Sequence, residues 1–412
     1  MRHLSRVGLF LLAFTVLSSV HPSGAAGPPA RKPLDSRQRE AVLSLIKAVD
    51  TAQEADAASN EALAWDGHVL KSGDQTAYIP FRLTHHGAGD GFTSTIMYVR
   101  AVTRRDGMRA SEEHSFLRDW LARGGVSPPP RMAETVSVGP GEMPVGGPAT
   151  GSSRRSIAAP AEALAVLALQ QRAYDKQVAV DAAAKKKLET RERDPLRFAF
   201  EDYYLVDGTS ARVAGARVFE RAMTLPPGEY DIFVGLLDRA RDKTSSSAIL
   251  KQTLVVPDFW NDRLAVSSLI LAKAVTPLKA PLAPAQQIEH PYTLGQTEVV
   301  PVAAPSFSTG EALSVVFQMS NYGAPDTDLT VDYAFYRIDG PRRLFNRTDA
   351  QRFSDDDLPA PRAWDTQAFA MQTVPLRSFP PGRYELEVSV RDRLTREAAS
   401  ATVAFSVVPE VR

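Results

Sequence analysis

The chain has 412 residues, its 48 Lys plus Arg are balanced by 48 Asp plus Glu, and it contains no cysteine. The lack of cysteine excludes a lipid-bearing lipoprotein residue, disulfide bonds, thiolate metal sites and cysteine nucleophiles. Because the net charge is zero, no overall field favours nucleic acid or an anionic membrane, and we predict no nucleic-acid partner.

Residues 1–26 are predicted to be a secretory signal peptide. A positive start, an apolar stretch and a run of small residues follow one another in Arg2, His3 and Arg6, then Val7–Val20, then Ser23–Ala26. We expect cleavage near Ala25 or Ala26. The apolar stretch is shorter than a membrane span, and no second one occurs, so no transmembrane segment is expected after cleavage. An exported chain without disulfides indicates a bacterial envelope, either periplasmic or extracellular.

The next segment, residues 27–60, is predicted to contain an amphipathic helix. Asp35 or Ser36 caps it, and apolar residues recur at helical spacing in Ala41, Val42, Leu45, Ile46 and Val49.

Strands are predicted at 65–70, 76–83 and 93–103, separated by turns rich in glycine and aspartate. Residues 106–194 are interpreted as an insertion. They include a Gly/Pro/Ser-rich excursion over 124–159, where we expect proteolysis to cut first, and an alanine-rich helix over 161–193. The basic run Lys185–Lys187 is typical of a solvated helix face. Strands resume after residue 195.

One phrase occurs twice. Leu225–Val234 reads Leu-Pro-Pro-Gly-Glu-Tyr-Asp-Ile-Phe-Val, and Phe379–Val388 reads Phe-Pro-Pro-Gly-Arg-Tyr-Glu-Leu-Glu-Val. A Pro-Gly corner, an alternating strand, a charged turn and a second strand are typical of the last hairpin of an immunoglobulin-like sandwich. Tyr230 and Tyr384 are predicted to be corner tyrosines, with the ring in the core and the hydroxyl on the backbone. A ligand-stacking role is the alternative.

The two copies differ on their outer faces. The second copy alternates cleanly between apolar and charged residues, whereas Phe233 and Leu237 make the outer face of the first copy too apolar for open water. We therefore predict that the N-terminal helix covers Phe233 and Leu237. The alternative is a free N-terminal arm that binds a partner.

The predicted fold class is mainly β, with two tandem immunoglobulin-like β-sandwiches, an N-terminal helix and a helical insertion in the first sandwich. The first sandwich is placed at 61–275, a proline-rich linker at 276–289 and the second sandwich at 290–412.

The doubled phrase resembles the closing strands of fibronectin type III and immunoglobulin-like modules. Three further stretches, Pro257–Asp262, Ser267–Leu271 and His290–Tyr292, resemble a group of uncharacterised secreted bacterial proteins of acidobacterial type. These are similar to the β-rich halves of proteins bearing a Gly-Trp-x-Thr-Asp domain or a von Willebrand A-related domain. The chain lacks both Gly-Trp-x-Thr-Asp and Asp-x-Ser-x-Ser. The resemblance covers 195–412 and implies a fold only.

The possible site residues do not assemble into a known pattern. His85 and His86 lie beside Asp90, but neighbouring strand residues face opposite ways, so no metal site is predicted there. Asp355–Asp357 lacks the spacing of a calcium loop, and Asn346-Arg347-Thr348 matches a glycosylation sequon of low specificity. The tryptophans are scattered at Trp65, Trp120, Trp260 and Trp364, and Trp260 is predicted to fill the domain junction.

No catalytic motif is found, so we predict no catalytic, cofactor-binding or metal-binding residues and no enzyme activity. The leading hypothesis is an exported, non-enzymatic β-sandwich protein that binds or scaffolds protein or glycan partners of the cell envelope. The alternatives are a carbohydrate-binding or adhesive module and, third, an unrecognised hydrolase. The sequence does not define the oligomeric state.

Overall fold

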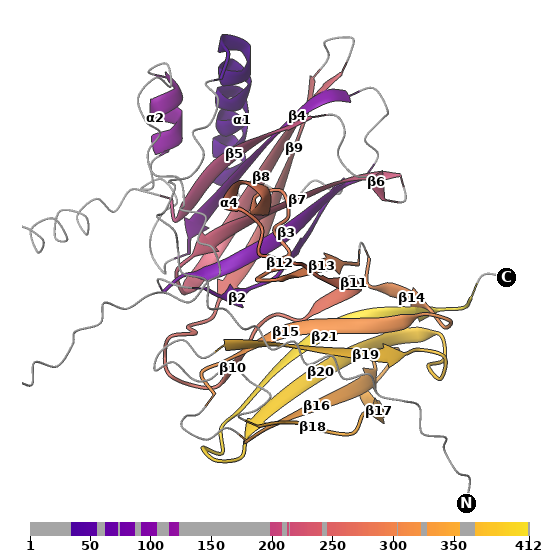
Figure 1. Cartoon of the computed structure of the whole chain (residues 1–412). Helices are drawn as coiled ribbons and strands as arrows, with labels where there is room; N and C mark the ends of the chain where they lie inside the picture. The colour runs from indigo at the N-terminus through magenta and orange to yellow at the C-terminus, as the bar shows by residue number, and fades with distance from the viewer. Residues whose placement is uncertain are drawn as a thin grey trace, which may run out of the picture.

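The computed structural model describes residues 34–410 apart from 56–61, 73–74, 87–91, 105–114, 123–197, 208–211, 214, 241–244, 303, 323–327 and 355–366. The predicted signal peptide and most of the predicted insertion therefore lie outside the described residues. In the described part the chain is mainly β, and its long strands form four sheets (Figure 1).

Two sheets come from the first half of the chain. Sheet A contains β1 (Leu63–Gly67), β2 (Leu70–Lys71), β3 (Ala77–His85), β6 (Arg212–Val213) and β7 (Ala216–Leu225). Sheet B contains β4 (Phe92–Thr103), β5 (Phe200–Asp207), β8 (Gly228–Ala240) and β9 (Ser245–Val256). Their facing side chains form one core, in which Phe81, Val99 and Ile232 are fully buried.

The second half of the chain forms the other two sheets. Sheet C contains β10 (Ala265–Val266), β11 (Ile270–Pro277), β12 (Thr293–Leu294), β13 (Thr297–Pro301), β15 (Ala312–Ser320) and β19 (Gln367–Pro375). Sheet D contains β14 (Ser306–Ser308), β16 (Asp328–Arg337), β17 (Arg343–Arg347), β18 (Gln351–Ser354), β20 (Gly382–Asp392) and β21 (Ala398–Val408). They enclose a second core around Phe317, Phe335 and Tyr384.

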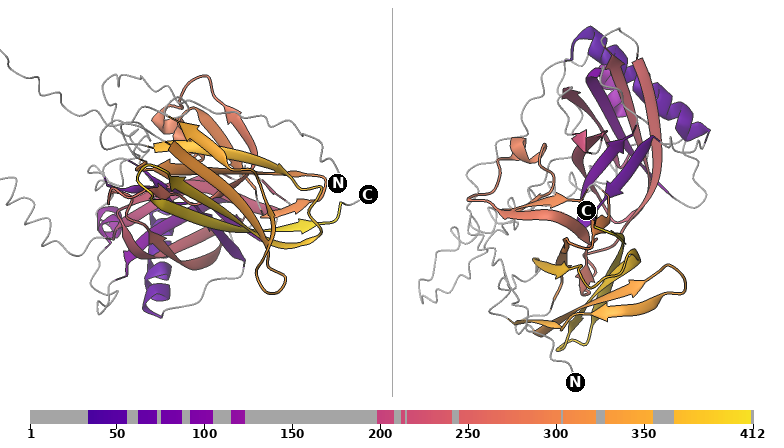
Figure 2. Two further views of the ribbon diagram at one scale, coloured as in Figure 1. Left: turned by 90° about the horizontal axis from the view of Figure 1, so that it is seen from below. Right: turned by 90° about the vertical axis from the view of Figure 1, so that its right-hand side faces the viewer.

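The four sheets are stacked in the order B, A, C, D (Figures 1 and 2). The outer faces of sheets A and C share a third apolar cluster, in which Tyr78 meets Ile270 and Val316. The strands in the middle of the stack are therefore buried on both faces: seven consecutive residues of β3 and six of β15 are buried. The outward positions of these two strands accordingly include apolar residues such as Tyr78 and Val316, whereas the outward positions of β20 are charged or polar.

The N-terminal helix α1 (Ser36–Glu54) covers sheet B, as the apolar outer face of the first hairpin predicts. Asp35 caps α1 by accepting the backbone N–H of Gln38 at 2.7 Å. Its apolar face packs against Phe233 and Leu237. At Gly235 a Cβ atom would lie only 2.8 Å from Leu45 Cδ1, so glycine lets the helix approach this closely.

A buried arginine ties α1 to the sheet. Arg100 on β4 is 1% exposed and donates to Asp50 at 2.7 Å and to Gln53 at 2.9 Å, both on α1. Its guanidinium also lies 4.1 Å from the centre of the Phe198 ring. The short helix α2 (Phe116–Ala122) joins the same cluster, because Arg118 reaches Asp50 at 3.1 Å.

Both predicted corner tyrosines have the expected geometry. The Tyr230 hydroxyl donates to the carbonyl of Pro226 at 2.9 Å, and the Tyr384 hydroxyl donates to that of Pro380 at 2.7 Å. Tyr230 is 2% exposed and Tyr384 fully buried, so both rings belong to their cores. The structural interpretation of the doubled phrase is therefore confirmed over the ligand-stacking alternative.

The chain crosses between the two halves earlier than the sequence suggests. β11 begins within residues 61–275, assigned to the first sandwich, and ends in the predicted linker, yet it pairs with β15 and β13 of sheet C. Residues 276–289, assigned to a linker, instead join β11 to its own sheet neighbours through the one-turn helix α4 (Pro284–Gln287). The crossing falls at 257–264, between β9 and β10. The prolines in 276–289 therefore mark a connection between strands of one sheet and not a linker between domains.

Candidate functional site

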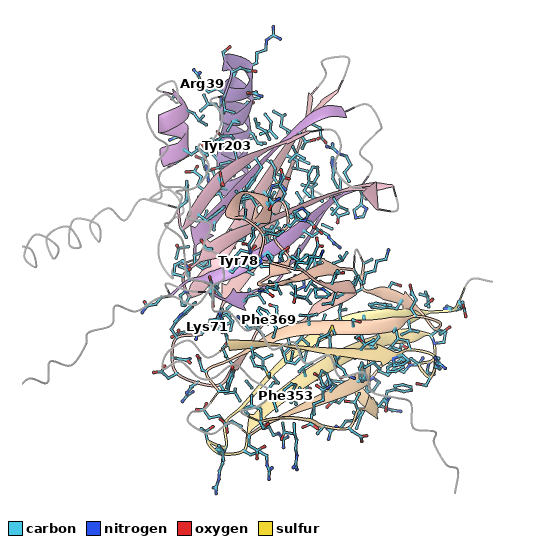
Figure 3. The ribbon with its side chains drawn as sticks, in the orientation of Figure 1. Arg39, Lys71, Tyr78, Tyr203, Phe353 and Phe369 are labelled. Atoms are coloured by element: carbon cyan, nitrogen blue, oxygen red, sulfur yellow. The ribbon has the colours of Figure 1, made fainter. Side chains whose placement is uncertain are left out.

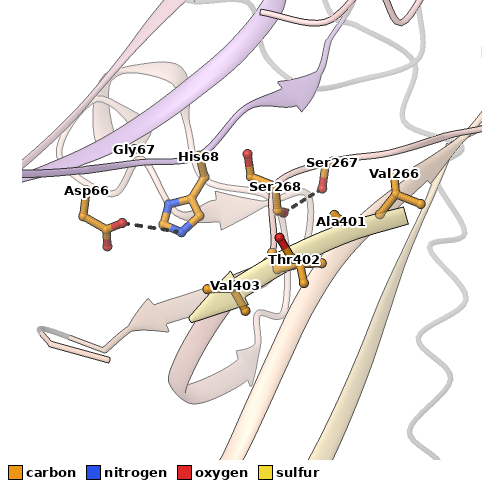
Figure 4. A pocket seen from close by; sticks show the side chains of 10 residues that line it. Asp66, Gly67, His68, Val266, Ser267, Ser268, Ala401, Thr402 and Val403 are labelled. Carbon is orange, nitrogen blue, oxygen red and sulfur yellow. Dashed lines mark hydrogen bonds and ion pairs between the residues drawn. The ribbon is translucent and has the colours of Figure 1, made fainter. Parts of the chain in front are cut away.

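A cleft lies where the two halves of the molecule meet (Figure 4). Its volume is about 370 Å³. Three segments line it, one from the end of β1, one from the chain around β10 and one from β21: Asp66, Gly67 and His68, then Val266, Ser267, Ser268 and Leu269, then Ala401, Thr402 and Val403. Because both cores contribute walls, the shape of the cleft depends on how the halves are joined.

The first wall is shaped by Gly67. A Cβ atom at this position would lie 2.6 Å from the indole nitrogen of Trp65, so glycine leaves room for that side chain. The Trp65 ring stacks on Phe81 with centroids 4.2 Å apart. The packing of Trp65 against the core thus anchors the end of β1, where Asp66, Gly67 and His68 line the cleft.

His68 is held in place and is only 7% exposed. Its Nδ1 lies 3.1 Å from the hydroxyl of Tyr292, and its Nε2 lies 3.9 Å from a carboxylate oxygen of Asp66. Burial lowers the pKa of His68 below its ordinary value of 6.5 and outweighs the opposing effect of Asp66, while the charge of Arg82 lowers this pKa further. The imidazole is therefore neutral at neutral pH.

The second wall joins the two halves by backbone contacts. Ser268 Oγ accepts the N–H of Val69 at 2.9 Å, and the Ser268 N–H donates to the Val69 carbonyl at 3.1 Å. Ser267 Oγ accepts the N–H of Gln318 and donates to the Ser268 carbonyl, each at 2.9 Å. These hydroxyls hold the junction together, and in the described structure they form no hydrogen bond with His68.

Deeper in the junction, a buried amide links the halves. Gln318 is fully buried, and its Oε1 accepts the N–H of Lys71 at 2.7 Å while its Nε2 donates to the Lys71 carbonyl at 3.1 Å. The Lys71 ammonium donates to Asn321 Oδ1 at 2.7 Å. Tyr78 and Phe369 belong to the apolar cluster at this contact (Figure 3). Gln318 and Lys71 therefore have partners on the other half, which fixes the two halves relative to each other.

The third wall is the edge of β21. On one side β21 pairs with β20 from Ala398 to Val407. On its other side β21 pairs, among the described residues, only with β14, in parallel and at residues 406–408. Thr402 is exposed and Ala401 and Val403 are half-buried. These cleft residues pair with no strand but β20 in the described residues, although β10 lies close to β21.

Of the two histidines singled out in the sequence, His85 has a structural role. His85 Nδ1 lies 3.3 Å from Asp238, which also binds Arg217 at 2.8 Å and the hydroxyl of Thr95. Burial acts to raise the pKa of Asp238, but hydrogen bonds from His85 and Thr95 and the charge of Arg217 outweigh it and lower this pKa. His86 is exposed, Asp90 lies outside the described residues, and no group of three metal-ligating side chains occurs in the described part.

The other candidates are separate from the cleft. Trp65 and Trp260 pack against the first core, and Asn346 lies exposed on β17. Asp355–Asp357 and Trp364 lie outside the described residues, as does the side chain of Trp120. Sequence reasoning missed His68, Asp66 and Gln318, which belong to no motif. The signal present was the pair of stretches Ser267–Leu271 and His290–Tyr292, which both lie at the junction.

Comparisons with known proteins add little. No protein-family model matches the chain, and no curated protein is significantly similar to it. Among solved structures, the chain is similar to Bacteroides uniformis β-glucuronidase at 8% identity and a TM-score of 0.23, covering 81% of this chain and 26% of that chain. Red sea bream transglutaminase gives 8% identity and a TM-score of 0.18, covering 89% of this chain and 34% of that chain. The chain thus spans about a quarter to a third of the length of these enzymes, and at such TM-scores the likeness says nothing of activity.

Proposed function

We propose that this chain is an exported, non-enzymatic β-sandwich protein that binds or scaffolds partners of the cell envelope through the cleft at its junction. The observation that carries this proposal is that both halves build the cleft and that buried hydrogen bonds hold them together. A binding surface that is formed before its partner arrives avoids the entropy cost of ordering it. A scaffold likewise needs its two halves to be held rigidly relative to each other.

Two tandem immunoglobulin-like sandwiches are the finer description that we propose for the fold. The doubled hairpin supports it, since β8–β9 and β20–β21 each start at a Pro-Gly corner with a buried tyrosine. The parallel pairing of β14 with the end of β21 also supports it for the second half, as does the packing of two sheets around each core.

Export is proposed from the order of charged, apolar and small residues in 1–26. In the described residues, no helix is long and apolar enough to cross a membrane. We place the mature protein in the periplasm or outside the cell. Sequencing of the protein in envelope fractions should find a first residue near Gly27, and a chain there that still begins at Met1 would contradict export by cleavage.

Site-specific crosslinking in the native cells tests the binding role. A photoreactive amino acid at Thr402, which is exposed in the cleft, should capture an envelope protein or glycan. The same group at Gln252, exposed on β9 of the first core, is the control. Capture from Thr402 that does not exceed capture from Gln252 would refute a cleft-centred binding function.

A further inference from the structure

The two edges of sheet D differ in how they are protected from other strands. β17, at one edge, carries Arg343 and Arg347 and pairs with β16 through an irregular register. β21, at the other edge, has no charged residue, no proline and no register shift from Ala398 to Phe405. In the described residues, no backbone hydrogen bond connects this stretch to a strand other than β20.

An edge of this kind is unusual because its free N–H and C=O groups can pair with any extended chain. Proteins protect such edges with charges, prolines or bulges, or cover them. The arginines and the irregular register of β17 are such a protection. Residues 398–405 of β21 have neither, and β10, which lies close to β21, forms no backbone hydrogen bond with them in the described residues. The difference within one sheet indicates that the β21 edge is kept available for a strand.

The surroundings of the β21 edge indicate which kind of chain can pair with it. Ala401 to Val403 lie in the cleft, opposite Asp66–His68 and the segment around Ser267. A second copy of the chain has the same edge recessed in the same way, so two folded copies cannot bring these residues together. A single extended polypeptide is narrow enough to enter the cleft, whereas the edge of a folded sheet is too wide.

The opposite wall carries a negative charge without a cationic partner in the described residues. The side chain of Asp66 is 54% exposed, and its one ion-pair neighbour is His68, at 3.9 Å, whose burial keeps it neutral. A lysine or arginine on the incoming chain complements this carboxylate.

We propose that the cleft binds an extended peptide segment of a partner protein, which adds a strand to the β21 edge between Ala398 and Phe405 and places a basic side chain opposite Asp66. Main-chain hydrogen bonds then supply the affinity, and the pairing with Asp66 makes the cleft prefer peptides with a basic side chain at that position. This inference rests on the proposed binding function and narrows its partner to a polypeptide.

Fluorescence anisotropy with synthetic peptides tests this pairing. The probes are a labelled peptide of alternating Thr and Val, as long as the edge from 398 to 405, the same peptide with a central Lys, and an N-methylated version of each. We expect both unmethylated peptides to bind and the N-methylated versions to bind at least about tenfold more weakly, because they lack the strand-pairing N–H groups. Equal binding by the methylated peptides overturns the proposal.

Matched variants locate the binding to one edge. Thr402→Lys adds a charge to the exposed β21 edge and should abolish binding of the neutral peptide, whereas Leu344→Lys adds the same charge to exposed β17 and should leave it unchanged. Asp66→Asn should weaken binding of the Lys peptide several-fold without affecting the neutral one. Equal effects of the two lysine variants, or no effect of Thr402→Lys, contradict strand addition at β21.

Hydrogen exchange and sedimentation identify other occupants. Amides of 398–405 that are fully protected before peptide is added would show that the chain itself covers the edge, and a dimer lost in Thr402→Lys would assign the edge to a second copy. Either result overturns the proposal. If crosslinking from Thr402 captures an envelope component while peptides fail to bind, the binding function stands and the strand-addition inference fails.

Discussion

Tyr384 combines a ring in the second core with a hydroxyl bound to the backbone four residues earlier. Its ring stacks on Phe405 with centroids 5.5 Å apart, and its hydroxyl donates to the Pro380 carbonyl at 2.7 Å. We expect Tyr384→Ala to lower the free energy of unfolding by about 3–5 kcal/mol, as other truncations of large core residues do.

The companion variant separates the hydroxyl from the ring. Tyr384→Phe should cost about 1–2 kcal/mol, because only the hydrogen bond to Pro380 is lost. Urea unfolding curves of both variants provide the measurement, and Tyr230→Phe should behave likewise in the first core. An unchanged midpoint for Tyr384→Ala would mean that the ring contributes nothing to packing.

His68 gives the stability a dependence on pH. Its pKa in the folded protein lies below the value of about 6.5 expected for the unfolded chain, so the unfolded state binds the proton first as the pH falls. The part of the free energy of unfolding that depends on neutral His68 is thus fully present above about pH 6.5. It is lost as the pH falls through the pKa that His68 has in the folded protein.

Unfolding free energies between about pH 8 and pH 5 test this linkage. His68→Gln should flatten the decrease below pH 6.5 relative to the parent protein. Gln252→Ala, which changes an exposed side chain that does not titrate, is the control and should leave the slope as it is. A parent slope that survives in His68→Gln would assign the pH dependence to other groups.

At the scale of elements, α1 and β8 fit together because Gly235 has no side chain. A methyl group there would approach Leu45 Cδ1 to 2.8 Å and Val49 Cγ2 to 3.1 Å. Gly235→Ala should therefore lower the free energy of unfolding by about 1–3 kcal/mol through overpacking. Gly340→Ala is the matched control and should be close to neutral, because a Cβ atom added at Gly340 would have no contact within 4 Å.

The position of α1 and both tyrosine corners could be predicted from sequence because each depends on local patterns. An alternating strand with an apolar outer face requires a cover, and a helix with an apolar stripe requires a surface. The cleft could not be predicted in this way. Its residues, such as Asp66, Ser268 and Thr402, are ordinary strand and loop residues, and only the stacking of sheet A on sheet C brings them together.

The crossing point between the halves was missed for a related reason. The sequence of β11 is compatible with a strand of either half of the molecule, and nothing in it indicates that β15 is its partner. Pairing between distant strands is set by packing over the whole molecule. The prolines near residue 280 were the stronger local signal, and they mark a loop inside sheet C.

At the scale of the whole molecule, the junction should make the two halves unfold together. Gln318 bonds both the N–H and the carbonyl of Lys71, and an apolar cluster surrounds this contact. We expect one calorimetric transition for the parent protein, because neither half can unfold without exposing the other half's buried face.

Weakening the junction should divide this transition. Gln318→Ala leaves the Lys71 N–H without its acceptor, costs about 1–3 kcal/mol at the junction and should separate two transitions. Gln252→Ala, which changes an exposed amide far from the junction, should retain one. Two transitions in the parent protein would show that the halves are energetically independent.

The helix that covers sheet B also constrains how this protein can vary between species. A descendant that lost α1 would expose Phe233 and Leu237 to water, so those two positions would have to become polar in the same lineage. A change at Gly235 to a larger residue would require smaller residues at Leu45 or Val49. We therefore expect the helix and the face it covers to change together, and an alignment of related chains in which they vary independently would contradict this coupling.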